Sequence, residues 1–165
     1  KALHPVEFIV VTGFHAAPIE KELNRLVKLM GLSITIVHNQ NASTGQASSV
    51  RLALESLDSA FDVVAMCLSD QPQIGEHELI ALLNQFIDRE PNQDVVMPMV
   101  AGQRGNPVLF SKKAVEEMLQ IPGMVCRSFM DKNPNRVKIF NSDNDAYVLD
   151  VDTDADIQKL GITRA

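Results

Sequence analysis

The chain has 165 residues, 45% of them apolar and 22% charged, which is enough to bury one core without disulfides and excludes disordered, collagen-like and small secreted classes. Its 15 basic and 21 acidic residues leave a net charge of −6. This acidic field repels nucleic-acid phosphates and anionic lipid head groups, so we expect neither a nucleic acid nor a membrane as a partner.

The two cysteines and the short apolar runs indicate a soluble protein. Cys67 and Cys126 lie far apart, without the CxxC or histidine-rich spacing of a zinc site, and Cys67 falls in an apolar run typical of a core. The longest such run, residues 63–68, is far shorter than the roughly 18 residues that a membrane span requires. We therefore expect a cytoplasmic protein.

The first hundred residues alternate between predicted strands and helices. Apolar, β-branched runs predict strands over 8–11, 34–37, 63–68 and 94–100, the last weakened by Pro98. Apolar residues at helical spacing predict a helix from about Pro18 that Gly31 ends, and further helices over 50–57 and 76–87. The polar segment 39–48 has no periodicity and predicts a loop.

Beyond residue 100 the pattern loosens. It predicts a strand over 108–110, a helix over 112–119, a short helix from Met124 that Pro134 ends, strands over 137–140 and 147–151, and a last helix capped by Thr153.

The alternation of strands and helices predicts the fold class. It implies right-handed βαβ crossovers and a mainly parallel sheet with helices on both faces, a Rossmann-like α/β fold in one domain over residues 1–165. In such sheets, ligands bind beyond the carboxyl ends of the strands, which here are residues 13–15, 38–49 and 69–71. Functional residues are expected there first.

Asp70 is the first candidate for chemistry. The tripeptide Asp70-Gln71-Pro72 directly follows a predicted buried strand, so the carboxylate would project into the ligand crevice. There a Mg²⁺ ion could bridge it to nucleotide phosphates. The alternative from the residues alone is an ordinary turn, since Asp and Pro are common turn residues.

Asp150 and Asp152 form a second acidic candidate. The run 150–156 is not a calcium loop, because Ala155 and Gly161 stand where an EF-hand needs glycine and glutamate. On the predicted strand 147–151, alternation places Asp150 and Asp152 on one face, where a pair of carboxylates could ligate a cation. A solvated strand face is the alternative.

Two loops of small residues could contact a ligand. The loop with Gly45, Ser48 and Ser49 precedes a helix, so its amides and hydroxyls could meet a base or a phosphate. Helix capping by one of the two serines is the alternative. In the loop 102–107, glycines allow a substrate to approach the backbone and Arg104 could pair with a phosphate, although a plain turn explains the loop equally well.

The histidines and glycines match no common catalytic motif. None of the four histidines has metal-ligand spacing or an inferred serine or cysteine partner, so we expect no nucleophilic triad. His15 and His38 nevertheless fall at predicted strand ends, where they could line a pocket. The sequence contains neither G-x-G-x-x-G nor the P-loop pattern.

Four segments taken in order, GQASSVRLAL, DVVAMCLSDQP, GQRGNPVLF and YVLDVDTDADI, resemble the MobA-like nucleotidyltransferases, most closely the molybdenum cofactor cytidylyltransferase branch. The resemblance runs from about residue 8 to residue 160 and implies a nucleotide-diphospho-sugar transferase fold and Mg²⁺ dependence. It implies that Asp70 and Asp152 are catalytic metal ligands. It also implies that Ser49 lies near the base and that Gly105, Asn106 and Pro107 lie beside the acceptor. Gly45 and Ser48, from the same loop as Ser49, are further candidate nucleotide contacts on the loop pattern.

The sequence departs from this family in two places. The family opens with a central strand and a basic, glycine-rich loop, LAAGxSxRMGxxK, which grips the triphosphate. Without that strand its neighbours would expose unpaired backbone, so we expect the natural chain to begin about 30 to 40 residues upstream of Lys1. The second departure is residues 123–127, where the branch has a GDxGAR-like stretch of which Arg127 is retained, and this departure leaves the identity of the acceptor open.

The resemblance implies a reaction in which a terminal phosphate of molybdopterin attacks the α-phosphorus of CTP and releases pyrophosphate. Transfer of GMP or another nucleotide, or transfer to another phosphorylated acceptor, is an alternative among enzymes. A non-catalytic nucleotide-binding module is the alternative outside them, followed by a generic flavodoxin-like binding domain. The sequence does not predict the oligomeric state.

Overall fold

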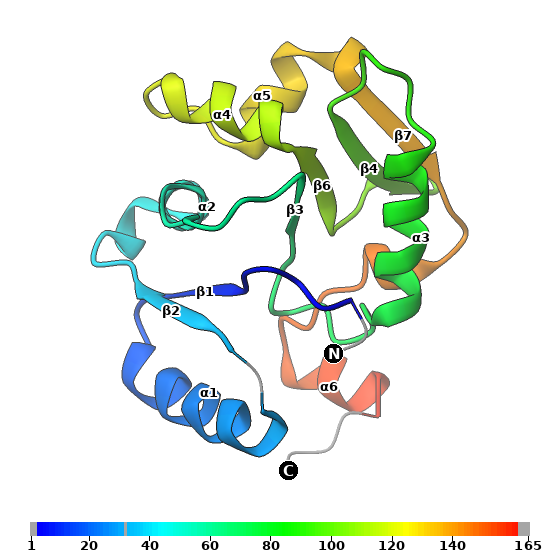
Figure 1. The fold of residues 1–165 in the computed structure, drawn as a ribbon. Helices are drawn as coiled ribbons and strands as arrows, with labels where there is room; N and C mark the ends of the chain where they lie inside the picture. Colours follow the sequence, from blue (N-terminus) through cyan, green and yellow to red (C-terminus); the bar gives the residue numbers. More distant parts are fainter. Residues whose placement is uncertain (1–2, 32, 162–165) are drawn as a thin grey trace. The chain divides into compact units, whose positions relative to one another are not determined.

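A computed structural model of the chain describes residues 3–31 and 33–161, and its elements largely follow the predicted alternation (Figure 1). The chain divides into two compact units. Unit 1 comprises Lys1–Asp62 and Lys112–Lys132, and unit 2 comprises Val63–Ser111 and Asn133–Ala165. In the described ranges, no helix is both long and apolar enough to cross a membrane.

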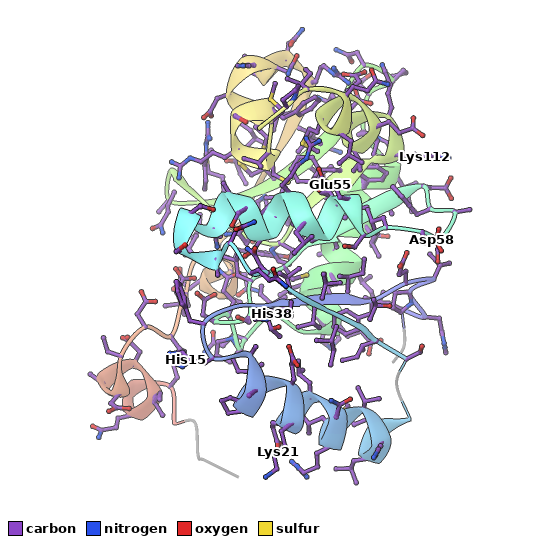
Figure 2. All side chains as sticks on the ribbon, turned by 90° about the vertical axis from the view of Figure 1, so that its left-hand side faces the viewer. His15, Lys21, His38, Glu55, Asp58 and Lys112 are labelled. Carbon is purple, nitrogen blue, oxygen red and sulfur yellow. The ribbon has the colours of Figure 1, made fainter. Side chains whose placement is uncertain are left out.

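Unit 1 is built on a pair of parallel strands. Strands β1 (Ile9–Thr12) and β2 (Thr35–His38) pair in register, with Ile9 opposite Thr35. Figures 1 and 2 show helices α1 (Ala16–Met30) and α2 (Gln46–Glu55) on opposite sides of this pair. The unit is completed by the 3₁₀ turn η1 (Ala42–Thr44) and by helices α4 (Lys112–Gln120) and α5 (Cys126–Lys132). The predicted βαβ crossover is thus present in the first 40 residues.

Gly31 ends α1 as predicted. Its φ of 61° lies in the left-handed region, which a residue without Cβ adopts at little cost, and its N–H donates to the carbonyl of Val27. The helix stops there and the chain turns toward β2.

Arg51 of α2 satisfies the carboxyl end of α4. Its guanidinium donates to the carbonyl oxygens of Met118 at 2.8 Å and Leu119 at 2.7 Å, and to that of Ile121 at 3.1 Å. The last carbonyls of a helix have no hydrogen-bond partner within the helix, so the Arg51 side chain of α2 caps the carboxyl end of α4.

Unit 2 contains a five-stranded sheet. Its strands are β3 (Val63–Met66), β4 (Val95–Val100), β5 (Gln103–Arg104), β6 (Val108–Ser111) and β7 (Val137–Asn141). Its helices and 3₁₀ turns are α3 (Glu76–Ile87), η2 (Pro134–Arg136), η3 (Asp145–Tyr147) and α6 (Asp154–Lys159).

The sheet of unit 2 mixes parallel and antiparallel pairs. Strand β4 pairs with β7 in parallel, but β4 with β5, β4 with β6, and β3 with β6 are antiparallel. The connection between β4 and β6, residues 101–107, is too short for the crossover that a parallel pair requires. The α/β class is therefore confirmed, with antiparallel pairs where the sequence predicts a mainly parallel sheet.

Strand β4 is the centre of unit 2 despite Pro98. All its residues but Met99 are buried, and Pro98 lies beyond the pairing of β4 with β6, which covers Val95 and Val96, and before its pairing with β5. The missing N–H of proline therefore falls where the partner strand changes. The strand predicted over 94–100 is present as β4 and continues through Pro98.

The core of unit 2 lies between α3 and the sheet. Buried side chains from four elements, α3, β4, β6 and η3, form one cluster, which comprises Leu82, Phe86, Val96, Val100, Leu109 and Tyr147. Tyr147 is 1% exposed, its ring stands edge-on to Phe140, and its hydroxyl donates to the carbonyl of Glu78 at 3.0 Å. The segment that follows Tyr147 is thereby anchored to the core.

Three local predictions are wrong. Residues 145–147 form a 3₁₀ turn, begun by the Asn144 side chain accepting from the Ala146 N–H, so no strand runs over 147–151. The predicted loop 39–48 contains η1 and the first turn of α2. Cys67 is exposed, as is Ala65 on the same face of β3, because side chains two residues apart on a strand point the same way.

Candidate active site

Asp70 lies just beyond the carboxyl end of β3, as the sequence predicts. Its backbone carbonyl accepts a hydrogen bond from the N–H of Val151 at 2.8 Å. Its carboxylate oxygen Oδ1 is buried and has no hydrogen-bond partner. A buried carboxylate oxygen without a donor is costly, which makes this atom a candidate ligand position.

Gln71 lies in the predicted ligand segment 69–71, but its sequence pattern assigned it no role of its own. Its side chain is 5% exposed, and its Nε2 donates to the carbonyl of Tyr147 at 3.2 Å and to Asp150 Oδ1 at 2.9 Å. Its Oε1 is buried without a partner. Two adjacent residues, 70 and 71, therefore each bury one unsatisfied acceptor.

The carbonyl of Tyr147 connects the predicted loop 102–107 to Gln71. It accepts from the N–H of Asn106 at 2.8 Å as well as from Gln71. Gly105 fits only because it lacks a side chain, since a Cβ there would lie 2.6 Å from the Tyr147 carbonyl oxygen. The peptide between Asn106 and Pro107 is cis, and Pro107 is fully buried. The loop of Gly105, Asn106 and Pro107 is thus tied to the segment that follows Tyr147.

Asp150 and Asp152 are connected to Asp70 by a backbone hydrogen bond and not by the predicted strand. No strand puts them on one face, but both flank Val151, whose N–H bonds to Asp70. Asp150 and Asp152 are both exposed, and the N–H of Asp152 donates to Asp156 Oδ2 in the capping box of α6. Within unit 2, the backbone therefore connects both predicted metal ligands, Asp70 and Asp152, through one hydrogen-bonded segment.

The oxygen atoms of Asp70, Gln71 and Asp152 are of the kind that bind a hydrated divalent cation. They are carboxylate and amide oxygens, which hard cations such as Mg²⁺ prefer, and two of them lack partners. Among the described residues no three acidic, histidine or cysteine side chains cluster closely enough to hold a metal by themselves. Mg²⁺ is commonly held by one or two carboxylates together with waters and substrate phosphates.

The predicted loop with Gly45, Ser48 and Ser49 lies in unit 1, and the Asn39 side chain organises it. The Asn39 side chain is 5% exposed, and its Nδ2 donates to the hydroxyl oxygens of Ser48 at 2.8 Å and Ser49 at 2.9 Å. Gly45, with φ of 101°, is the N-cap of α2, so neither serine is the cap. The hydroxyl of Ser48 donates to the Gly45 carbonyl instead. Polar composition alone gave no signal that Asn39 holds both serines.

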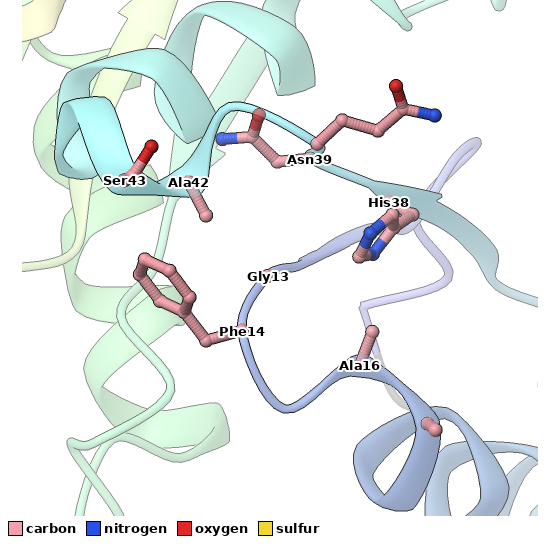
Figure 3. A pocket seen from close by; sticks show the side chains of 9 residues that line it. Gly13, Phe14, Ala16, His38, Asn39, Ala42 and Ser43 are labelled. Carbon is pink, nitrogen blue, oxygen red and sulfur yellow. The ribbon is translucent and has the colours of Figure 1, made fainter.

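A cavity of about 270 Å³ opens in unit 1 at the carboxyl ends of β1 and β2 (Figure 3). Its lining comprises Gly13, Phe14, Ala16, Ala17, His38, Asn39, Gln40, Ala42 and Ser43. Next to it, Thr12 donates to Glu20 Oε1 at 2.7 Å, and the His38 ring lies 3.9 Å from the same oxygen. The predicted ligand segments 13–15 and 38–49 therefore meet, with His38 but not His15 in the lining.

The surroundings of Tyr147 oppose ionisation of its phenol. Burial, and then the negative charge of Glu78, raise the pKa of the Tyr147 phenol. Burial also opposes ionisation of Glu78, but hydrogen bonds from its own N–H, the Gly75 N–H and the Asn144 amide together lower its pKa. The neutral phenol keeps its hydrogen bond to α3, which fixes the carbonyl that Gln71 and Asn106 share.

Comparison with known proteins gives one family match and several solved structures. The model of the MobA-like NTP transferase domain matches residues 1–137. Comparison with curated proteins gives no significant match.

Three solved structures illustrate the structural likeness. Rv0371c from Mycobacterium tuberculosis in complex with manganese matches with a TM-score of 0.62 and 24% identity, over 95% of this chain and 78% of that one. The 4-diphosphocytidyl-2C-methyl-D-erythritol synthase from Anaerococcus prevotii matches with a TM-score of 0.69 and 15% identity, over 93% and 76%. A cytidylyltransferase from Leptospira borgpetersenii matches with a TM-score of 0.61 and 16% identity, over 92% and 66%. At these identities the likeness establishes a shared fold.

Proposed function

Because this chain belongs to the MobA-like NTP transferase domain family, a family of nucleotidyltransferases, we propose that it transfers CMP from CTP to a terminal phosphate of a molybdopterin-type acceptor. The observation that carries the proposal is the buried, unpartnered carboxylate oxygen of Asp70 at the end of β3. The two structural neighbours whose names include cytidylyl chemistry support CTP as the donor. The acceptor rests on the four ordered segments of the sequence.

In this proposal a phosphate oxygen of the acceptor attacks the α-phosphorus of CTP. The bond from that phosphorus to the bridging oxygen breaks, and pyrophosphate leaves with the electron pair. No covalent enzyme intermediate forms, so the chain contributes positioning and charge. Bound Mg²⁺, held by Asp70 and Asp152, would neutralise charge on the α-phosphate and on the leaving group.

The chain's own residues divide this work. Asp70 presents its unpartnered oxygen from the turn that follows β3, and the hydrogen bond from the Val151 N–H to the Asp70 carbonyl keeps the Asp152 segment beside it. We assign Gly105, Asn106 and Pro107 to the acceptor side. Gly45, Ser48 and Ser49 are assigned to the nucleotide, with Asn39 holding the two hydroxyls in place.

We also propose that residues 1–165 act as one catalytic domain in the cytoplasm. The family match runs through parts of both compact units, which supports a single functional domain. Transfer of GMP or another nucleotide, or transfer to a different phosphorylated acceptor, would keep the same roles for Asp70 and Asp152. A non-catalytic nucleotide-binding module is the alternative outside enzymes.

Mass-spectrometric product analysis tests the proposal. The natural full-length protein is incubated with Mg²⁺, molybdopterin and each of the four nucleoside triphosphates in turn. We expect a CMP adduct with CTP only, and no adduct from Asp70→Asn. Asp143→Asn, which alters an exposed carboxylate outside the group, is the matched control and should retain activity. A GMP adduct would correct the donor, and a folded wild-type protein that yields no adduct would refute the proposed transfer.

A further inference from the structure

Gln71 has an unusual arrangement for a buried amide, because only one end of it is satisfied. Both hydrogens of Nε2 have acceptors, in the Tyr147 carbonyl and Asp150 Oδ1, while Oε1 is buried without a donor. A purely structural glutamine in a core usually has both ends paired, since an unsatisfied buried acceptor is costly. The unpaired oxygen therefore calls for a donor from a ligand.

The surroundings of Gln71 have too many acceptors and too few donors. Asp70 Oδ1 is also buried without a partner, and the Gln71 amide reaches the carboxylate of Asp150. Such a group of oxygens carries negative charge and needs both a counter-charge and O–H donors. A hydrated divalent cation supplies both, the first directly and the second through its bound waters.

We infer that Gln71 is a positioning residue for the divalent cation, an inference that rests on the proposed function. Its Nε2 end fixes the segment 147–152 against the end of β3, through Asp150 and the Tyr147 carbonyl. Its Oε1 end accepts a hydrogen bond from water on the bound cation. Asp150 acts as the anchor for Gln71, and its role is to accept that hydrogen bond.

Binding of Mn²⁺ alone, measured from the electron paramagnetic resonance signal of the free ion, tests this inference without reference to turnover. Gln71→Met keeps the volume and removes both polar ends, so we expect about tenfold weaker Mn²⁺ binding. Its thermal unfolding in EDTA should match the wild type, because the lost hydrogen bonds are offset by removal of an unsatisfied acceptor. A structural role alone would lower the unfolding temperature in EDTA.

Asp150 provides the matched pair of controls. Asp150→Ala removes the acceptor for Nε2 and should weaken Mn²⁺ binding about as much as Gln71→Met, about tenfold. Asp150→Asn keeps an acceptor oxygen and should stay within about threefold of the wild type. The double variant Gln71→Met with Asp150→Ala should lose about tenfold in total, because the two residues act as a unit.

Three results would overturn the inference. They are wild-type Mn²⁺ affinity in Gln71→Met, an equal loss in Asp150→Asn and Asp150→Ala, and a double variant whose loss is the product of the single losses. Asp70→Asn separates this inference from the proposed function. If Asp70→Asn binds Mn²⁺ like the wild type, the metal site itself is wrong and both fail. If it loses binding while Gln71→Met does not, only the role of Gln71 fails.

Discussion

Replacing Gly105 by alanine should destabilise unit 2 and disturb the site together. The new Cβ would lie 2.6 Å from the carbonyl oxygen of Tyr147 and 2.9 Å from its Cβ, so one of the two backbones must move. Tyr147 resists movement, since its side chain is 1% exposed and its hydroxyl is bonded to α3. The φ of Gly105 lies outside the left-handed region, so the cost is one of space.

The magnitude follows from these contacts. Overpacking of this kind costs about 1–3 kcal/mol, and weakening the hydrogen bond from the Asn106 N–H to Tyr147 adds about 1 kcal/mol. Alanine also lowers the conformational entropy of the unfolded chain, which stabilises the fold by about 0.5 kcal/mol. We therefore expect the free energy of unfolding to fall by about 1.5–3.5 kcal/mol, as measured by urea denaturation followed by circular dichroism.

Gly75→Ala is the matched control for Gly105→Ala. Gly75 has an extended backbone, and its added Cβ would meet only the Glu78 carboxylate at 3.4 Å, an ordinary contact. It should cost less than about 1 kcal/mol. A Gly105→Ala variant as stable as this control would refute the steric argument and the close approach of the two loops.

Three further predictions concern stability. Arg51→Lys should lower the free energy of unfolding, measured by thermal unfolding, by about 2 kcal/mol, because one ammonium cannot donate to all the carbonyls that the guanidinium reaches. Wild-type stability in this variant would contradict the role of Arg51 at the end of α4. Asp94→Ala should lower the free energy of unfolding by about 3–5 kcal/mol in urea denaturation, because it removes the buried carboxylate that lies 2.7 Å from the Arg136 guanidinium. A loss below about 1 kcal/mol would contradict a stabilising role of this ion pair. The lowered pKa of Glu78 stabilises the fold above pH 4.5, its ordinary value, and this contribution is lost as the pH falls through the folded value. Acid unfolding should therefore be less steep in Glu78→Gln, and an identical pH profile would show that Glu78 has no such role.

The sequence predicts those parts of the fold that local patterns determine. The apolar runs and helical spacing locate β1, α1 and α3 to within two residues, and the end of α1 follows from the conformation that Gly31 allows. The apolar run over 63–68 also locates β3, which Asp70 follows. These features depend on residues close together in the chain.

The errors arise where distant contacts decide. Alternating apolar residues over 147–151 imitate a strand, yet the Asn144 cap and the burial of Tyr147 against α3 produce a 3₁₀ turn. Gln71 meets Asp150, 79 positions away, and no local pattern reports that contact. Asn39 likewise contacts Ser48 and Ser49 only because α2 turns back toward the end of β2.

The most direct test of the proposed transfer is a simultaneous count of pyrophosphate and CMP adduct from the natural full-length protein with CTP, Mg²⁺ and molybdopterin. We expect equal amounts of pyrophosphate and CMP adduct from the wild type, and neither product from Asp70→Asn. Undiminished adduct from Asp70→Asn, or pyrophosphate released without adduct, would contradict the proposed transfer.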